Sequence, residues 1–268
     1  ASHRNVEGGP RNSRLENSAF RLVGGLRGDF GEGVWGYEVF GQYSETSDSS
    51  LSTNDFIIEN LQQAFNVVSD ANGNPVCADP SGGCVPYNIF QRGPNGESLV
   101  TQEALDFIQG VGLVIGSTSQ LVVGANVQAD LGEYGFSSPF SEEGIAFLLG
   151  VEYREDSLES IPDEISQVPG GGFTGVGGAT LPVAGSVDVY EIYSELQIPL
   201  ITDKPFFREL TLSGQYRYSD YSTDGNGTSN SFATDAFGIQ LTWAPVEDLT
   251  LRGQFQRAVR APNVIELF

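Results

Sequence analysis

The sequence is poor in histidine and in positive charge, and it contains no methionine. Among 268 residues there is one histidine, His3, and 13 Lys and Arg stand against 35 Asp and Glu, which gives a net charge of −22. One histidine in a polar segment argues against Ser-His-Asp, Cys-His and histidine-rich zinc chemistry. The acidic excess argues against nucleic acid as a partner, because phosphates need a Lys/Arg surface. It also argues against docking on anionic lipid through a basic patch.

Long apolar runs are missing as well. No stretch of about 18 apolar residues occurs, so no transmembrane helix is predicted. Residues 1–5 are polar and do not form a signal peptide, which needs an apolar segment. Because the first residue is not methionine, we expect a processed or truncated chain. What is present, 39% hydrophobic residues and 34 glycines, is typical of an all-β protein with many turns rather than of disorder.

Alternation of apolar and polar residues is the main positive signal. From residue 121 to 131 the odd positions are Leu, Val or Ala, and the even positions are mostly Gly, Asn, Gln or Asp. Such a period of two indicates a strand with one apolar and one polar or small face. The pattern predicts eight long strands, at about residues 18–29, 34–54, 116–131, 144–157, 185–200, 209–222, 231–243 and 249–259.

The connections between these strands alternate in length. They are short at residues 30–33, 132–143, 201–208 and 244–248, and mostly longer at 55–115, 158–184 and 223–230. Short turns on one rim and long loops on the other are typical of an outer-membrane β-barrel. Short links also imply antiparallel neighbours. Aromatic residues flank the proposed short turns, as in an interfacial girdle.

A soluble β-sandwich also alternates, but two features favour the membrane barrel. The strands exceed the usual length of about five or six residues. Their polar faces hold glutamine, glutamate, arginine and glycine, which suits a wet lumen. The predicted lumen-lining residues are Glu38, Gln42, Asn126, Gln128, Glu152, Arg154, Arg217, Gln240, Arg252 and Gln254.

The longest connection has local structure of its own. Leu61, Ala64, Phe65 and Val68 follow helical spacing and predict a short amphipathic helix over residues 58–68. A second short helix is predicted to start at Thr101. Residues 70–75 have turn chemistry.

The only cysteines, Cys77 and Cys84, bracket a turn-forming stretch in this connection. Two sulfurs without histidine make a poor zinc site, and the spacing is not that of a Cys-x-x-Cys redox pair. We expect a disulfide that pins the tip of the loop, which requires an oxidising compartment.

Enzymatic chemistry has little support in the residues. Acidic residues invite a glycosidase hypothesis, since two carboxylates suffice there. Candidates such as Glu155 and Asp156, or Asp163 and Glu164, lie in or beside a predicted surface loop, and nothing places two of them across a cleft. We predict no catalytic residue, no metal site and no cofactor.

Four motifs, in the same order as in the family, carry a resemblance to TonB-dependent outer-membrane receptors. One is the ending Arg260, Ala261, Pro262, Asn263, Glu266, Leu267 and Phe268, which resembles the Arg-Ala-Pro-Asn-x-x-Glu-Leu-Phe stretch of these receptors. The others are residues 4–11 with their Val-Glu-Gly-Gly core, residues 84–90 and residues 189–200.

The resemblance implies a barrel of about 22 strands, plugged by an N-terminal domain, in the outer membrane of a Gram-negative bacterium. It implies uptake of a scarce small ligand, such as an iron chelate or a saccharide, with energy delivered through TonB. Outer-membrane lipid, the plug domain with TonB behind it, and a ligand at the extracellular loops are the implied partners. We expect the chain to be an internal segment of such a barrel, spanning residues 1–268 and lacking the plug.

Two alternatives stay open on the sequence. The first is a complete eight-stranded outer-membrane barrel with a structural or adhesive role, since eight strands can close into a barrel whose interior is filled by side chains. A secreted carbohydrate-active sandwich predicts solubility without detergent and a functional acidic pair.

Overall fold

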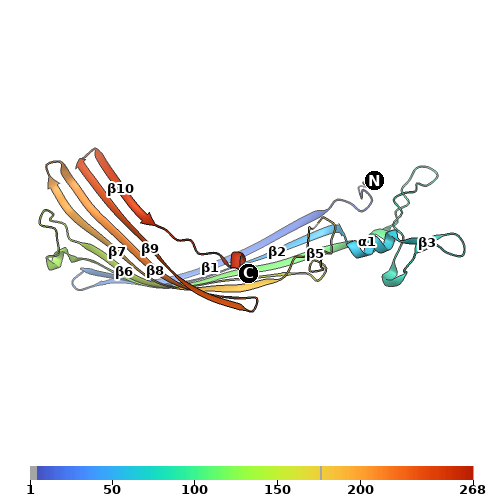
Figure 1. Cartoon of the computed structure of the whole chain (residues 1–268), viewed down its shortest axis with the longest axis horizontal. Helices are drawn as coiled ribbons and strands as arrows, with labels where there is room; N and C mark the ends of the chain where they lie inside the picture. The colour runs from blue at the N-terminus through green and yellow to red at the C-terminus, as the bar shows by residue number, and fades with distance from the viewer. Residues whose placement is uncertain (1–4, 176, 268) are drawn as a thin grey trace. The chain divides into compact units, whose positions relative to one another are not determined.

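An open antiparallel sheet dominates the computed structural model, which describes residues 5–175 and 177–267. Its strand order is β1-β2-β5-β6-β7-β8-β9-β10, so strands that follow one another in this order are hydrogen-bonded neighbours (Figure 1). The strands are β1 (Asn12–Phe30), β2 (Trp35–Phe56), β5 (Gln109–Asp130), β6 (Ala146–Pro162), β7 (Val183–Lys204), β8 (Phe207–Gly225), β9 (Thr228–Val246) and β10 (Leu249–Arg257).

Each of the eight predicted strands coincides with one strand of this sheet, so the predicted all-β antiparallel class is confirmed. The strands are mostly longer than predicted. β5, for example, begins at Gln109 rather than near residue 116, and Val111, Leu113 and Ile115 continue its alternation, mostly with glycine, through the added stretch.

The prediction of a longer loop at residues 223–230 is wrong. Gly225 of β8 pairs with Thr228 of β9, so only Asn226 and Gly227 link the two strands. Both have positive φ, 51° and 77°. An Asn-Gly pair with two positive φ values is the favoured two-residue hairpin turn.

The chain divides into two compact units. The first comprises residues 1–18, 47–117 and 159–183. It holds α1 (Ile58–Phe65), the small hairpin of β3 (Val67–Ser69) and β4 (Pro75–Cys77), the 3-10 turn η1 (Ser81–Gly83) and α2 (Gln102–Ile108). Its core is Ala64, Tyr87, Ala104, Leu105 and Ile108.

Both predicted helices are present in this unit. α1 ends at Phe65, earlier than the predicted residue 68, because Val67 and Val68 pair with β4 instead. α2 is capped by Thr101, whose side chain accepts a hydrogen bond from the Ala104 N–H. The predicted start at Thr101 is therefore confirmed.

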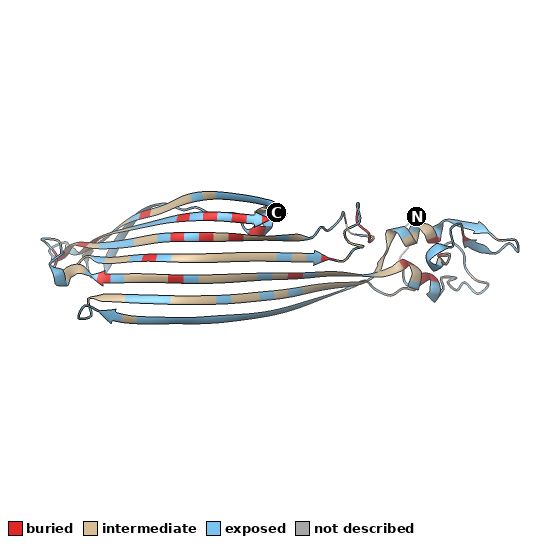
Figure 2. Cartoon of the chain, turned by 90° about the horizontal axis from the view of Figure 1, so that it is seen from below, coloured by how far each residue is buried: buried red, intermediate tan, exposed pale blue. Residues whose placement is uncertain are grey.

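The second unit comprises residues 19–46, 118–158 and 184–268. It also holds η2 (Leu131–Tyr134) and α3 (Val264–Leu267). Strands β7 to β10 lie side by side and curve (Figure 1), and buried and exposed residues alternate along part of the sheet (Figure 2). Its small core is Val187, Val189, Tyr221 and Val264.

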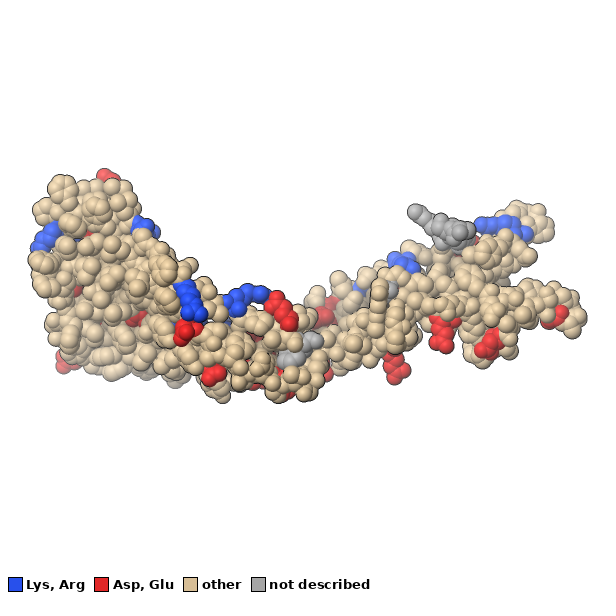
Figure 3. Space-filling view, viewed as in Figure 1, with Lys and Arg blue, Asp and Glu red and all other residues tan. Residues whose placement is uncertain are grey.

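One face of the sheet in the second unit is apolar and exposed. Large side chains more than a third exposed occur on this face of all eight strands; they include Phe20, Leu22, Val39, Val123, Val151, Ile192, Tyr216, Ile239, Leu251 and Phe255. In the space-filling view, the visible surface of β7–β10 is mostly uncharged (Figure 3). An exposed apolar area of this kind marks a surface that contacts a membrane or another protein.

Aromatic side chains gather at the short turns of this unit. Phe30 stacks on Trp35 at 6.0 Å between ring centroids, and the Trp35 indole N–H donates to the Tyr134 hydroxyl. At the β7–β8 turn, Trp243 contacts the Phe207 ring and donates to the Phe206 carbonyl. Tryptophan and tyrosine with satisfied polar atoms are characteristic of a membrane–water interface.

Among the described residues, no helix is both long enough and apolar enough to cross a membrane.

Candidate functional site

The ten residues predicted to line a lumen lie on the other, polar face of the sheet. Gln128, Gln240 and Gln254 line one hollow, and Arg154 and Arg217 line a second. Gln42 bonds to Gln120 of the second hollow. Strand alternation places Glu38, Asn126, Glu152 and Arg252 on the same face as these residues.

A hydrogen-bonded chain crosses this face from β1 to β6. Arg21 donates to Gln42, whose amide donates to Gln120 Oε1 at 3.0 Å. Gln120 donates to Asp156 Oδ1 at 2.8 Å, and Arg154 Nε lies 3.2 Å from Asp156 Oδ2. Two arginines, two amides and a carboxylate therefore tie four neighbouring strands together.

A buried carboxylate lies on the same face at β7. Glu191 is 7% exposed and accepts hydrogen bonds from Arg217 at 2.9 Å and from the Ser219 hydroxyl at 2.6 Å. The Arg217 guanidinium also lies 5.0 Å above the Tyr193 ring centre. A desolvated carboxylate is tolerated only with such partners, so this cluster fixes the guanidinium in one position.

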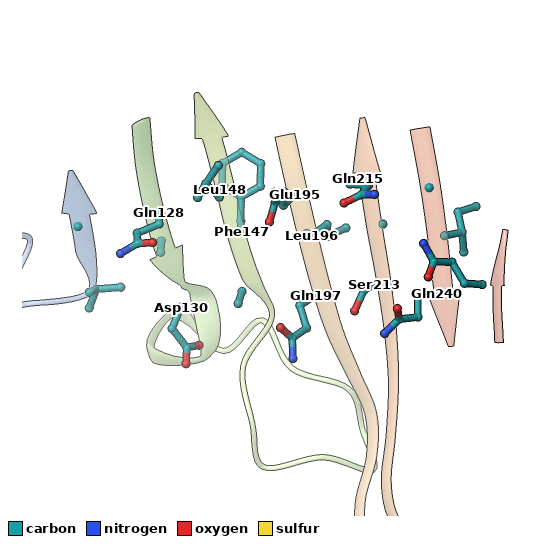
Figure 4. A pocket seen from close by; sticks show the side chains of 18 of the residues that line it. Gln128, Asp130, Phe147, Leu148, Glu195, Leu196, Gln197, Ser213, Gln215 and Gln240 are labelled. Carbon is teal, nitrogen blue, oxygen red and sulfur yellow. The ribbon is translucent and has the colours of Figure 1, made fainter. Parts of the chain in front are cut away.

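The first hollow lies on this face toward the short turns and has a volume of ≈ 560 Å³ (Figure 4). Strands β1, β2, β5, β6, β7, β8, β9 and β10 and the β1–β2 turn contribute to its wall. Its polar side chains are Asp29, Gln128, Asp130, Glu195, Gln197, Ser213, Gln215, Gln240 and Gln254.

Glycines make room for the amides of the first hollow. A Cβ added at Gly36 would lie 3.2 Å from Gln128 Nε2, and one added at Gly238 would lie 2.9 Å from Gln215 Nε2. The glutamine side chains thus lie against the neighbouring strand at positions where a larger residue would displace them.

The second hollow has a volume of ≈ 740 Å³ and lies between the sheet and the segment after β10. Val259, Ala261, Pro262, Asn263, Val264 and Ile265 of that segment line it. The sheet side combines the two ion pairs with the apolar Leu158 and Val187. This volume falls within the usual range for a small-molecule site, about 300–1,000 Å³.

The segment of the Arg-Ala-Pro-Asn motif folds on itself. Asn263 Oδ1 accepts from the Glu266 N–H at 2.9 Å, and Glu266 accepts from the Asn263 N–H at 3.0 Å, which is a reciprocal capping box for α3. Arg260 bonds both oxygens of Glu266 at 2.7 and 2.8 Å. Hydrogen bonds from Arg260, and then from the Asn263 backbone, lower the pKa of Glu266.

The apolar members of this motif hold the segment on the sheet. Val264 belongs to the core with Val187, Val189 and Tyr221, and Ala261 and Leu267 pack against it. Pro262 lines the second hollow. Phe268 lies outside the described residues.

Two other motifs meet in the first unit. The Tyr87 hydroxyl donates to Asn5 Oδ1 at 3.1 Å, and Gln109 donates to the Gly8 carbonyl at 2.9 Å. Tyr87 is 4% exposed; burial, and then the charge of Glu7, raises the pKa of its hydroxyl. Of residues 4–11, Arg4 lies outside the described residues.

The predicted disulfide between Cys77 and Cys84 is present. It joins β4 to the residue after η1, beside the core that includes Tyr87. Nearby carboxylates are held by local turns: a hydrogen bond from the Asn74 backbone lowers the pKa of Asp70, and one from the Ser81 backbone lowers that of Asp79.

Sequence reasoning missed several members of the polar face: Arg21, Gln120, Asp156, Glu191, Glu195, Gln197, Gln215 and Ser219. Strand alternation was the available signal, since Glu191, Glu195 and Gln197 share one side of β7. No cluster of three or more metal-ligating side chains exists within the described part of the chain.

Comparison with known proteins gives one result that covers nearly all of the chain. No curated protein matches the sequence. The family model described as TonB dependent receptor-like, beta-barrel, matches residues 4–268. This family is one of outer-membrane transport proteins rather than enzymes. The chain belongs to the TonB-dependent receptor-like β-barrel family.

Proposed function

We propose that this chain forms part of the wall of an outer-membrane transporter that takes up a scarce small ligand with energy delivered through TonB. The observation that carries the proposal is the family match over residues 4–268 together with a sheet that is apolar on one face and polar on the other. A barrel wall between lipid and a wet lumen needs this two-faced sheet.

The apolar face of the second unit would contact lipid. Its side chains come from all eight strands, and aromatic residues lie at its short turns. In hydrocarbon every backbone polar group must be paired within the protein, which β-strands achieve only in a closed sheet. Eight strands are far fewer than the about 22 of the plugged transporters in this class. The eight strands are thus proposed as one portion of a wider barrel wall. In this proposal residues 1–268 all belong to the barrel, and none of them belongs to the plug domain.

The polar face would line the lumen, where its residues meet ligand or the plug domain. The lumen-lining set of ten residues, from Glu38 to Gln254, is supported by their common face and by the two hollows. The disulfide-pinned unit around Cys77 and Cys84 would lie on the extracellular side and contact ligand there, since long loops carry recognition in such barrels. A disulfide at that place is consistent with an oxidising compartment outside the cytoplasm.

Energy-dependent uptake tests this function. Cells that express the complete protein containing this chain would be compared with cells that lack its gene, using radiolabelled ferric chelates and oligosaccharides. We expect uptake of at least one compound that requires both the gene and TonB and that stops when a protonophore is added. Uptake that is equal in the two strains, or unaffected by loss of TonB, would contradict the proposal.

A further inference from the structure

We propose that the first hollow selects neutral, polyhydroxylated ligands of the oligosaccharide class and disfavours anionic ones such as anionic ferric chelates. This inference rests on the proposed transport function and names the ligand class for it. It comes from the side chains that line the hollow and from the charge they present (Figure 4).

The wall of the hollow is built from amides and carboxylates. Five glutamines, Gln128, Gln197, Gln215, Gln240 and Gln254, come from five strands and converge on it, together with Asp29, Asp130 and Glu195. Among the residues that line it there is no lysine and no arginine. A lumen lined by carboxylates without cations repels anions, whereas anion-selective pores use rings of Arg or Lys.

The nearby cations are either engaged or outside the hollow. Arg154 pairs with Asp156, Arg217 with Glu191, and Arg21 donates to Gln42. Arg252 and Arg257 lie on β10 and are not among the residues that line this hollow. The charged side chains that line the hollow are therefore all acidic.

Several amides are free to serve a ligand. Within residues 5–175 and 177–267, the side chains of Gln128, Gln197 and Gln215 make no hydrogen bond to the protein. Each amide offers two N–H donors and one carbonyl acceptor. Hydroxyl groups both donate and accept, so a polyol can pair with this mixed set. An anionic ligand cannot pair with the carboxylates. A site built to bond hydroxyl groups rejects ligands that lack them.

The test uses the complete protein in cells and asks which class of probe it takes up. The neutral probes are labelled maltohexaose, xylohexaose and chitohexaose, and the anionic probe is iron-55 ferric citrate. We expect TonB-dependent uptake of at least one neutral oligosaccharide, and no such uptake of ferric citrate.

Variants of the hollow then connect the selectivity to these residues. The double variant Gln197→Lys with Gln215→Lys places two cations in the hollow. We expect it to reduce neutral uptake roughly 2- to 10-fold, the size of one or two lost hydrogen bonds, and to raise ferric citrate uptake. The double variant to Leu keeps the size without the charge and should reduce neutral uptake without admitting ferric citrate.

The control, Glu142→Lys, changes the net charge by the same two units on an exposed link outside the hollow. It should match the unaltered protein. TonB-dependent uptake of ferric citrate without any oligosaccharide uptake would overturn this inference while leaving the transport function intact. Loss of TonB dependence for every probe would overturn the transport function itself. Equal uptake by the Lys, Leu and unaltered proteins would overturn the role of the hollow.

Discussion

Three polar residues of the Arg-Ala-Pro-Asn motif make bonds mainly to one another rather than to the sheet. Arg260, Asn263 and Glu266 close a capping box and an ion pair within seven residues. The apolar Val264 then packs into the sheet core. The motif therefore encodes a short segment that is ordered locally and held on the polar face by its apolar side chains.

Removal of the cap should loosen this segment. We expect Asn263→Ala to destabilise α3 by about 1 kcal/mol, because an unpaired N–H remains at the helix start. Hydrogen–deuterium exchange of residues 261–267 measures the effect. Ile265→Ala is the matched control, since Ile265 is 63% exposed and does not cap the helix. Equal exchange in both variants would show that the capping box does not order the segment.

The ionisation of Asp163 should make the stability of the protein depend on pH. Burial by itself raises the pKa of Asp163, but hydrogen bonds from the Leu113 backbone, and from the backbone and hydroxyl of Ser166, outweigh it, so the pKa is lowered. A lowered folded-state pKa means that the stabilisation is complete above the ordinary pKa, about 4. It is lost as the pH falls through the lowered value.

We therefore expect Asp163→Asn to lower the melting temperature of the protein in detergent at pH 7 and to have a much smaller effect at pH 3. Thermal unfolding at the two pH values measures this. A difference between variant and unaltered protein that is as large at pH 3 as at pH 7 would contradict the account.

At the scale of an element, the proposed function places neighbouring residues of one strand in different surroundings, one in lipid and the next in the lumen. Both residues border the first hollow, but strand alternation turns the side chain of Ile239 of β9, which is 54% exposed, to the apolar face and that of Gln240 to the polar face. We expect Ile239→Arg to destabilise the folded barrel by about 2–4 kcal/mol if the residue lies near the bilayer midplane. Gln240→Arg should cost far less.

Urea unfolding of the complete protein in lipid vesicles measures both variants, and the pair controls for the added charge. A larger loss of stability for Gln240→Arg than for Ile239→Arg would mean that lipid contacts the polar face of the sheet, which would contradict the assignment.

We expect the disulfide to stabilise the short elements around it, from α1 to α2, rather than the whole chain. It closes the short loop from Cys77 to Cys84, which is worth roughly 2–3 kcal/mol by the loop-entropy estimate. We expect replacement of both cysteines by serine to increase proteolysis within residues 56–108 and to leave β7–β10 protected. Mass spectrometry of the fragments locates the cuts. Cleavage that increases equally in β7–β10 would contradict this local role.

The sequence predicted the long strands well because alternation is a local property of each strand. It missed the β3–β4 hairpin, whose strands are three residues long, and placed a loop where Asn226 and Gly227 form a tight turn. The contact of Tyr87 with Asn5 joins residues 82 positions apart, and the hollows combine up to eight strands. Such groupings depend on strand register and curvature, which residue patterns do not specify.

At the scale of the whole molecule, the family match and the two-faced sheet assign different surroundings to the two faces. The apolar face should contact hydrocarbon, and the face with the ion pairs and hollows should contact water. Ligand selectivity, plug contact and strand stability all depend on this assignment.

A spin-label scan along β9 tests this assignment most directly. Single cysteines at residues 232–243 of the complete protein, placed in outer-membrane vesicles and spin-labelled, report collision with oxygen, which concentrates in lipid, and with a polar nickel complex, which stays in water. The account predicts alternation with a period of two, with oxygen favoured at Phe237, Ile239 and Leu241 and nickel at Gly238, Gln240 and Thr242. Equal nickel access at both sets would contradict a membrane wall.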